Sequence, residues 1–310
     1  MANALSVGFV GLGNMGWPMA GNLARAGFPL TVRDADPARQ RRFAGEHACQ
    51  AADDPAAFRD ADAVVTMLPT GRIVREVMLE WQGGLGRALA RGAIVIDMSS
   101  SDPTGTRELG HALAGPGVAL VDAPVSGGVP KAESGTLAIM IGGDDEAAIA
   151  RARPLLETMG KRLFLTGPLG SGHAMKALNN YVAAAGFAAA AEALIVGAKF
   201  GLDPAVMVEI LNASTGRNFS TEYTCQEHVL PRTFATGFAL GLLAKDVGIA
   251  ADLAQAIGVD APVCRLLAQR WADAAAALGG GVDHSAALRH WEQANGVELP
   301  ARRPGGFSAG

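Results

Sequence analysis

The stretch Gly11-Leu12-Gly13-Asn14-Met15-Gly16 directly follows an apolar run, Leu5–Val10, and opens a helical pattern, Asn14–Ala26. Glycines spaced GxGxxG are a weak signal alone, but between a strand and a helix they are typical of a dinucleotide-binding turn. In such a turn Gly11 permits the tight bend, Gly13 lets the backbone approach a pyrophosphate, and Gly16 lets the helix pack against the strand. The N–H groups at the helix start favour phosphate. The stretch therefore predicts a nucleotide-binding domain.

An acidic residue at the end of the next apolar run supports this interpretation. The run Phe28–Val32 ends at Arg33-Asp34, and Asp34 lies 18 positions beyond Gly16. A carboxylate there accepts hydrogen bonds from both ribose hydroxyls of NAD and repels the 2′-phosphate of NADP. The neighbouring Arg33 leaves the use of NADP open, because a guanidinium can bind that phosphate. The alternative is an ordinary glycine-rich turn, with Asp34 capping the helix that follows.

The composition narrows the class of protein. The 310 residues are enough for two domains, and a hydrophobic content of 49% is ordinary for a soluble protein. The net charge is −4 and no Lys/Arg cluster indicates a nucleic-acid partner. The three cysteines, at positions 49, 225 and 264, fit neither a metal-ligand spacing nor a disulfide framework. We therefore expect a cytoplasmic protein without a metal site.

Two segments raise the question of a membrane. The N-terminal sequence MANALSVGFVGLG has no basic region, so it does not indicate a signal peptide. Residues Tyr181–Phe200 are almost all apolar and about as long as a membrane span. They include Glu192 and Lys199, however, and much of their apolarity comes from alanine and glycine. We therefore expect a buried core helix and no membrane partner.

The first half of the chain alternates short apolar runs with helical patterns. Several runs are continuous, which is typical of parallel strands buried on both faces. The predicted strands are Leu5–Val10, Leu30–Val32, Ala63–Leu68, Ala93–Met98, Ala119–Asp122, Leu137–Ile141 and, more weakly, Arg162–Leu165. The predicted helices are Asn14–Ala26, Pro37–Glu46, Pro55–Asp60, Arg72–Glu80, Pro103–Ala114 and Glu146–Met159. This order predicts an α/β Rossmann-type domain with a doubly wound parallel sheet.

Only helical patterns follow the sequence Thr166-Gly167-Pro168-Leu169-Gly170. They are His173–Phe200, Pro204–Ala213, Leu240–Ile257, Ala261–Leu278 and Ser285–Asn295, and most are separated by glycines. We therefore predict a dinucleotide-binding domain over residues 1–167 and an all-helical substrate and oligomerisation domain over residues 168–300. The tail, residues 301–310, contains turn formers with little to bury, and we expect it to be mobile.

Three further segments contain candidate catalytic or ligand-binding residues. The sequence Asp122-Ala-Pro-Val-Ser126-Gly127-Gly128 follows a predicted strand, where open α/β sheets bind ligands. The Ser126 hydroxyl and the N–H groups of two glycines suit a small carboxylate. The alternative is a simple turn.

The second segment opens the long helix. Lys176 and Asn180 are four residues apart, so they share a face, and Asn179 lies nearby. A partly buried lysine can transfer a proton. The alternative is a solvated lysine in the first helical turn. The third segment, Lys245-Asp246, interrupts an apolar stretch, and it equally fits an exposed ion pair on a helix surface.

Together these segments resemble the β-hydroxyacid dehydrogenase family, in particular the 3-hydroxyisobutyrate dehydrogenase group, from about residue 6 to about residue 294. The matching motifs are GLGNMGWPMAGNL (11–23), MLPT (67–70), DMSSSDP (97–103), DAPVSGG (122–128), GTL (135–137), GSGHAMKALNN (170–180) and LAKDVGIA (243–250). Several ordered motifs are far more specific than one. The resemblance implies a helical domain like that of 6-phosphogluconate dehydrogenase, and a homodimer or homotetramer.

The resemblance also implies roles for individual residues. Lys176 is the general acid/base, and Asn180 orients the substrate beside it. The substrate-binding residues are Ser126, Gly127, Gly128 and Asn179. The cofactor-binding residues are Gly11, Leu12, Gly13, Asn14, Met15, Gly16, Asp34, Leu68, Pro69, Ser100 and Lys245.

The expected reaction is the reversible NAD-dependent oxidation of a small hydroxy-carboxylate to a semialdehyde or ketone, with NADP use possible. The resemblance does not fix the substrate: 3-hydroxyisobutyrate, 3-hydroxypropionate, tartronate semialdehyde, threonate and succinic semialdehyde are all options. The alternatives are a semialdehyde reductase, an imine-reductase-like relative, and a non-catalytic nucleotide-binding protein. The pair of Lys176 and Asn180 argues against the last two.

Overall fold

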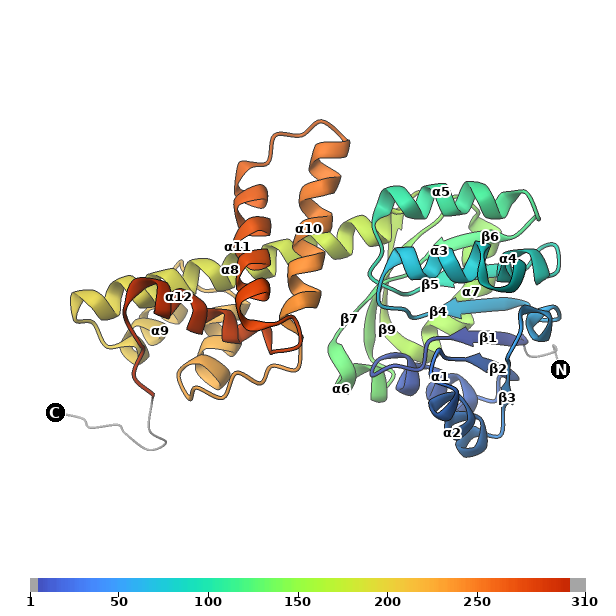
Figure 1. Cartoon of the computed structure of the whole chain (residues 1–310), viewed down its shortest axis with the longest axis horizontal. Helices are drawn as coiled ribbons and strands as arrows, with labels where there is room; N and C mark the ends of the chain where they lie inside the picture. Colours follow the sequence, from blue (N-terminus) through green and yellow to red (C-terminus); the bar gives the residue numbers. More distant parts are fainter. Residues whose placement is uncertain (1–4, 302–310) are drawn as a thin grey trace. The chain divides into compact units, whose positions relative to one another are not determined.

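The computed structural model describes residues 5–301. The chain divides into two compact units, an α/β unit of residues 1–176 and a helical unit of residues 177–310 (Figure 1). Of the tail predicted over residues 301–310, all but Ala301 lies outside the described residues.

The α/β unit is built on one nine-stranded sheet. Six parallel strands lie in the order β3-β2-β1-β4-β5-β6, which is the order of the dinucleotide-binding fold. They are β1 (Val7–Val10), β2 (Leu30–Arg33), β3 (Gln50–Ala51), β4 (Ala63–Thr66), β5 (Ile94–Asp97) and β6 (Ala119–Asp122). Beyond β6 the sheet is mixed, with β7 (Val125–Ser126), β8 (Leu137–Gly142) and β9 (Gly160–Gly167). The predicted doubly wound Rossmann-type fold is confirmed.

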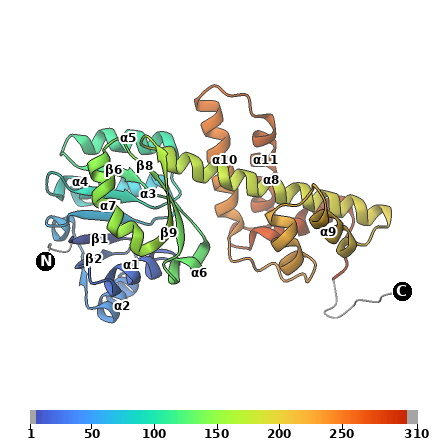
Figure 2. The same ribbon diagram turned by 180° about the vertical axis from the view of Figure 1, so that it is seen from behind.

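Helices cover both faces of this sheet (Figures 1 and 2). One face carries α1 (Gly16–Arg25), α2 (Pro37–His47), α6 (Gly128–Glu133) and α7 (Glu146–Met159), and the other carries α3 (Gly71–Leu79), α4 (Leu85–Ala88) and α5 (Pro103–Ala114). Successive strand residues point to opposite faces. Phe9 and Val65 therefore join one core, while Val10 and Val64 join the other. This double burial explains why the central strands are continuous apolar runs.

Aspartate caps fix where several helices begin. The side chains of Asp36, Asp102 and Asp145 accept backbone N–H groups at the starts of α2, α5 and α7, and Asp203 does the same for α9 (Pro204–Ala213). These caps satisfy donors that have no partner within the helix. As a result, the predicted bounds of α5, α7 and α9 agree with the structure.

The helical unit is organised around α8 (Ser171–Phe200), whose first turns belong to the α/β unit. It also contains α9, a π-helix η3 (Ser220–Val229), α10 (Leu240–Ala256), α11 (Pro262–Leu278), the short η4 (His284–Ala286) and α12 (Ala287–Asn295). Phe187 of α8, Trp271 of α11 and Trp291 of α12 pack together in the core.

Within the described residues, α8 is long and apolar enough to cross a membrane by length and composition. Ala184, Phe187 and Leu194 nevertheless lie buried in the core of the helical unit. This burial supports the interpretation of α8 as a core helix.

The sequence prediction missed several short elements and one longer one. The short ones are β3, β7, α4 and α6, of two to six residues each. The longer one is the π-helix η3. One predicted element differs in type: the helix predicted over Pro55–Asp60 is a 3₁₀ helix, η1 (Pro55–Phe58).

Candidate cofactor and active site

The predicted nucleotide-site residues of the α/β unit follow the carboxyl ends of adjacent parallel strands. The strand register pairs Val10 with Thr66, Thr66 with Asp97, and Asp97 with Asp122. The glycine turn follows β1, Leu68 follows β4, Ser100 follows β5, and Ser126 follows β6. The sheet therefore brings these segments to one edge, where open α/β folds bind ligands.

The glycine turn has the geometry that its spacing predicts. Gly11 has φ of +100°, and a Cβ there would clash with the carbonyl of Met67. A Cβ on Gly16 would clash with the carbonyl of Gly11. Around Gly13, by contrast, the space that a Cβ would occupy is open. Gly11 and Gly16 are thus needed by the fold itself, while Gly13 leaves room for a ligand beside the start of α1.

Asp34 is held at the end of β2 by the glycine turn itself. Its Oδ2 accepts a hydrogen bond from Leu12 N at 2.6 Å, and its Oδ1 accepts one from Asp36 N at 2.8 Å. The alternative that Asp34 caps the next helix is wrong, because Asp36 caps α2. Each carboxylate oxygen retains a lone pair, so Asp34 can still accept a hydroxyl group.

Arg33 and Arg39 have different surroundings. The Arg33 guanidinium donates to the Asp34 carbonyl and to Gln40 Oε1, and it lies 5.2 Å from the ring centre of Trp81. Arg39 lies 3.6 Å from Asp34 Oδ1 and is partly exposed. Arg39 is therefore the second cation beside the carboxylate, and the sequence analysis missed it.

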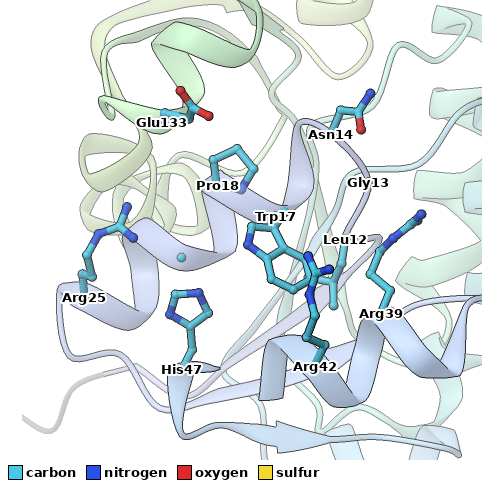
Figure 3. Close-up of a pocket in the computed structure, with 11 residues that line it drawn as sticks. Leu12, Gly13, Asn14, Trp17, Pro18, Arg25, Arg39, Arg42, His47 and Glu133 are labelled. Atoms are coloured by element: carbon cyan, nitrogen blue, oxygen red, sulfur yellow. The ribbon is translucent and has the colours of Figure 1, made fainter. Parts of the chain in front are cut away.

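Two cavities open beside the glycine turn. A cavity of about 590 Å³ runs from Gly13 along α1 and α2. Trp17 and Arg42 line it, and the Arg42 guanidinium lies over the Trp17 ring, 4.3 Å from the ring centre (Figure 3). A second cavity of about 390 Å³ lies beside Asp34. It is lined on its apolar side by Leu68, Ile73, Val77 and Trp81. Arg33, Glu76 and Glu80 also line it. An apolar wall beside Asp34, next to an open glycine turn, fits the adenosine and pyrophosphate parts of a dinucleotide.

The segment Ser126–Gly128 forms a second exposed turn at this edge. Ser126 ends β7 and is partly buried, while both glycines are exposed. Gly127 and Gly128 have φ of +139° and +67°, conformations that favour glycine. The backbone N–H groups of this turn and the serine hydroxyl offer donors that suit a carboxylate.

The start of α8 is anchored to the end of β6. Asp122 accepts hydrogen bonds from Gly170 N and His173 N, both at 2.8 Å. Lys176 follows one turn later and is partly buried. The alternative of a fully solvated lysine is therefore not supported.

Asn180 lies one turn beyond Lys176 and is held by a residue that the sequence analysis left unassigned. Its Nδ2 donates to Asp246 Oδ2 at 2.6 Å, and its Oδ1 accepts a hydrogen bond from Asn179 Nδ2 at 3.1 Å. Asp246 is only 3% exposed, and its Oδ1 lies 3.3 Å from Lys245 Nζ. The alternative of an exposed Lys245–Asp246 pair is therefore wrong. The signal that could have found Asp246 is a carboxylate placed between two apolar stretches of α10.

Cysteine chemistry is not indicated. Cys49, Cys225 and Cys264 are free thiols, and burial raises the pKa of Cys225 to about 12. Burial also raises the pKa of Cys49 and of Cys264. Within residues 5–301, no group of three or more His, Cys, Asp or Glu side chains is placed to hold a metal ion.

Comparison with known proteins agrees with this arrangement. Residues 6–167 match the family described as the NAD binding domain of 6-phosphogluconate dehydrogenase. Residues 170–291 match the family described as NAD-binding of NADP-dependent 3-hydroxyisobutyrate dehydrogenase. Together the two matches span nearly all of the described chain.

Individual relatives cover most of both chains. The 2-(hydroxymethyl)glutarate dehydrogenase of Eubacterium barkeri is 36% identical over 96% of this chain and 99% of its own. The 3-hydroxyisobutyrate dehydrogenase of Pseudomonas aeruginosa is 39% identical over 83% and 88%. The structure of Mycobacterium tuberculosis 3-hydroxyisobutyrate dehydrogenase with L-serine has a TM-score of 0.85 and 34% identity, covering 93% of this chain and 99% of that one.

The fold and the nucleotide turn define an oxidoreductase that binds a nicotinamide dinucleotide, NAD or NADP. Within that class, the chain belongs to the 3-hydroxyisobutyrate dehydrogenase-like β-hydroxyacid dehydrogenase family. It is an NAD(P)-dependent hydroxyacid dehydrogenase, as the resemblance of its motifs implied.

Proposed function

We propose that this enzyme catalyses the reversible, NAD-dependent oxidation of the hydroxyl group of a small β-hydroxyacid, with Lys176 as general acid/base. The observation that carries the proposal is the anchoring of α8. Hydrogen bonds from Gly170 N and His173 N to Asp122 fix its start at the carboxyl edge of the sheet, and Lys176 lies one turn later.

The chain's own residues account for binding and proton transfer. Lys176, in its neutral form, accepts the proton of the substrate hydroxyl, and in the reverse direction its ammonium returns that proton. The bound nicotinamide supplies the hydride acceptor or donor. Asn180, whose amide is held by Asp246, orients the substrate, with Asn179 beside it. Ser126, Gly127 and Gly128 bind the substrate carboxylate.

The residues proposed to hold the cofactor come from both units. The glycine turn, including Asn14 and Met15, binds the pyrophosphate at the start of α1, and Leu68, Pro69 and Ser100 border the nicotinamide. Asp34 binds the adenosine ribose and favours NAD over NADP. Lys245, on α10 of the helical unit, is also proposed to bind the cofactor.

The relatives indicate the class of substrate. The compounds in their names and structures are 3-hydroxyisobutyrate, L-serine and 2-(hydroxymethyl)glutarate. All three carry a primary hydroxymethyl group on the carbon next to a carboxylate, and they differ in the third substituent. We propose that this chain acts on a member of the same class.

Three alternatives remain distinct from this proposal. A semialdehyde reductase, of the tartronate or succinic semialdehyde type, uses the same residues with the reverse reaction dominant. An imine-reductase-like or non-catalytic protein needs no lysine held by an anchored helix. The anchored start of α8 therefore favours the dehydrogenase over the imine-reductase-like and non-catalytic proteins, and the preferred direction of the reaction distinguishes it from the semialdehyde reductase.

We also propose a soluble, cytoplasmic homodimer or homotetramer. The end of β9 at Gly167 and the start of α8 at Ser171 support a division into a dinucleotide-binding domain over residues 1–167 and a helical domain over residues 168–300. The boundary between the two compact units instead falls within α8, after Lys176.

A substrate panel tests the proposed function. Purified enzyme is incubated with NAD or NADP and each of several acids, and reduced nicotinamide is followed by absorbance. The panel contains 3-hydroxyisobutyrate, L-serine, 2-(hydroxymethyl)glutarate, 3-hydroxypropionate, glycerate and threonate, with 2-hydroxyacids as controls. We expect turnover of hydroxymethyl carboxylates with NAD. Turnover of none of the hydroxymethyl carboxylates, or turnover confined to the 2-hydroxyacid controls, would contradict the proposal.

A further inference from the structure

A cluster of polar side chains lies buried at the carboxyl edge of the sheet, below the turns that carry the candidate site. We call it the strand-end cluster. Each member is less than one-tenth exposed, although each side chain is polar or charged. Its members are Thr66, Asp97, Ser99, Ser101, Thr106, Asp122 and His173. Burying so many polar groups is costly unless each has a partner, so their contacts define what the cluster holds together.

Asp97 ties together the ends of β4 and β5. Its Oδ1 accepts hydrogen bonds from Thr66 Oγ1 at 2.8 Å and from Ser99 N at 3.0 Å. Its Oδ2 accepts one from Ser101 Oγ at 2.8 Å. Ser99 Oγ in turn accepts a hydrogen bond from Leu68 N at 2.9 Å. The turns after both strands are therefore fixed to one carboxylate.

His173 connects the start of α8 to α5 and to the end of β6. Its ring Nδ1 lies 2.8 Å from Thr106 Oγ1, and the Thr106 hydroxyl donates to the carbonyl of Asp102. Nδ1 is therefore the donor in its contact with Thr106. The backbone N–H of His173 donates to Asp122. Nε2 lies 3.6 Å from Asp97 Oδ2 and makes no hydrogen bond within the described residues. One residue thus contacts the start of α5 and the ends of β5 and β6.

The same contacts remove His173 from consideration as a proton donor to substrate. The residue is only 1% exposed, and its Nδ1 is engaged with Thr106. Lys176 lies three residues later on α8, about one turn away, so the two side chains lie on neighbouring parts of one helix face. A rotation or shift of the first turn of α8 would move Lys176 directly.

We infer that His173 is a positioning residue: through the Thr106 hydroxyl and the Asp122 carboxylate, it sets the orientation of the first turn of α8 and hence of Lys176. This inference rests on the proposed role of Lys176. A displacement of a catalytic group by about 1 Å can cost about 100-fold in rate. Loss of the His173 contacts should therefore lower kcat without altering how NAD binds to the glycine turn.

Three variants test the inference. His173→Phe keeps a ring but removes both nitrogens, and Thr106→Val removes the hydroxyl that faces Nδ1. His173→Asn places an amide nitrogen where Nδ1 lies, so it preserves the donor to Thr106. The exposed His111 of α5, changed to Phe, is the matched control. For each variant, kcat and KM are measured on the best substrate, the Kd for NAD by fluorescence titration, and the Tm by calorimetry.

We expect His173→Phe and Thr106→Val to lower kcat by about 10- to 100-fold, with the Kd for NAD unchanged within about twofold. We expect His173→Asn to keep kcat within about fivefold of the wild type, and His111→Phe to be unaffected. Because the Phe and Val variants remove the same contact, their effects should not add in the double variant.

Other outcomes would overturn the inference. A wild-type kcat for Thr106→Val or His173→Phe would show that the contact does not position Lys176. A parallel loss of kcat, NAD binding and Tm would assign His173 a purely structural role. If His173→Phe does not fold, Thr106→Val and His173→Asn still decide the question. Near wild-type turnover of Lys176→Ala would instead contradict the proposed function itself, whatever the His173 variants show.

Discussion

At the scale of single residues, we expect Asp34 to decide which nicotinamide dinucleotide is preferred. Its carboxylate accepts a hydrogen bond from Leu12 N and lies 3.6 Å from Arg39. Asp34→Asn keeps the acceptor for Leu12 N, removes the negative charge and releases Arg39 to meet a 2′-phosphate. Two charges 4 Å apart interact by about 1 kcal/mol in water and by more near a protein surface.

We therefore expect Asp34→Asn to raise the ratio of kcat/KM for NADP to that for NAD by about fivefold or more, measured with both cofactors on one substrate. The matched control is Asp60→Asn, because Asp60 is exposed and lies outside both cavities. An unchanged ratio, or a wild-type enzyme that already prefers NADP, would contradict the role given to Asp34.

Short-range patterns revealed some site residues and not others. The glycine turn and Asp34 follow from spacing alone, because a turn and the next strand end are local features. Asp246 and His173 do not, since their partners Asn180 and Thr106 lie 66 and 67 positions away. Neither residue's own neighbourhood in the sequence indicates its partner, and only the fold shows what it contacts.

At the scale of elements, we expect η4 to couple the stability of the helical unit to pH. Burial lowers the pKa of His284, whose ring packs against Phe187 and Phe238. Burial by itself raises the pKa of the adjacent Asp283. Hydrogen bonds from Ser285 and Thr236, together with the charge of His284, lower this pKa by more, so the net shift is downward.

The signs of these shifts predict acid destabilisation. His284 titrates below its ordinary pKa of 6.5 in the folded state, so the unfolded chain binds more protons as the pH falls below about 6.5, and the free energy of unfolding decreases. Asp283 contributes to the free energy of unfolding above its unfolded pKa of 3.8. This contribution is lost as the pH falls through the lower pKa of the folded state. Between pH 8 and pH 5, His284 therefore dominates this pair.

His284→Asn should be less stable than the wild type at pH 8, since it loses ring packing, but should lose less stability between pH 8 and pH 5. Urea unfolding followed by tryptophan fluorescence at the two pH values measures this difference, with the exposed His111→Asn as control. Equal losses in His284→Asn and the wild type would show that His284 is not responsible.

Physical reasons also explain which helices and strands were predicted correctly and which were missed. The bounds of α5 and α9 were predicted because an aspartate cap followed by proline marks the first turn. The two-residue strands β3 and β7 were missed because their pairing depends on neighbouring strands rather than on their own sequence. The π-helix η3, with the sequence STEYTCQEHV, lacks the apolar period of an α-helix and was missed for that reason.

At the scale of the whole molecule, we expect the chains to associate through exposed apolar side chains of the helical unit. Large exposed apolar side chains occur on several of its helices, including Val182, Val196 and Phe200 of α8, Val206 and Ile210 of α9, and Val263 and Leu266 of α11. Extensive exposed apolar surface marks association in soluble proteins, and identical chains commonly associate symmetrically.

We therefore expect light scattering at micromolar concentration to give a mass of at least twice the 31.7 kDa of one chain. Val196→Glu, on the exposed face of α8, should lower that mass or weaken association. Glu192→Gln, one turn earlier, is the control, although it also removes the partner of Arg270. A wild-type mass of a single chain would contradict the expected oligomer.

Turnover of the Lys176→Ala variant tests the central claim most directly. General acid–base catalysis typically contributes about 10²- to 10⁴-fold, so kcat on the best substrate should fall by that order while the Kd for NAD stays nearly unchanged. Lys176→Arg should not restore activity, because a guanidinium does not give up its proton near neutral pH. Near wild-type turnover of Lys176→Ala would contradict the assignment of this active site.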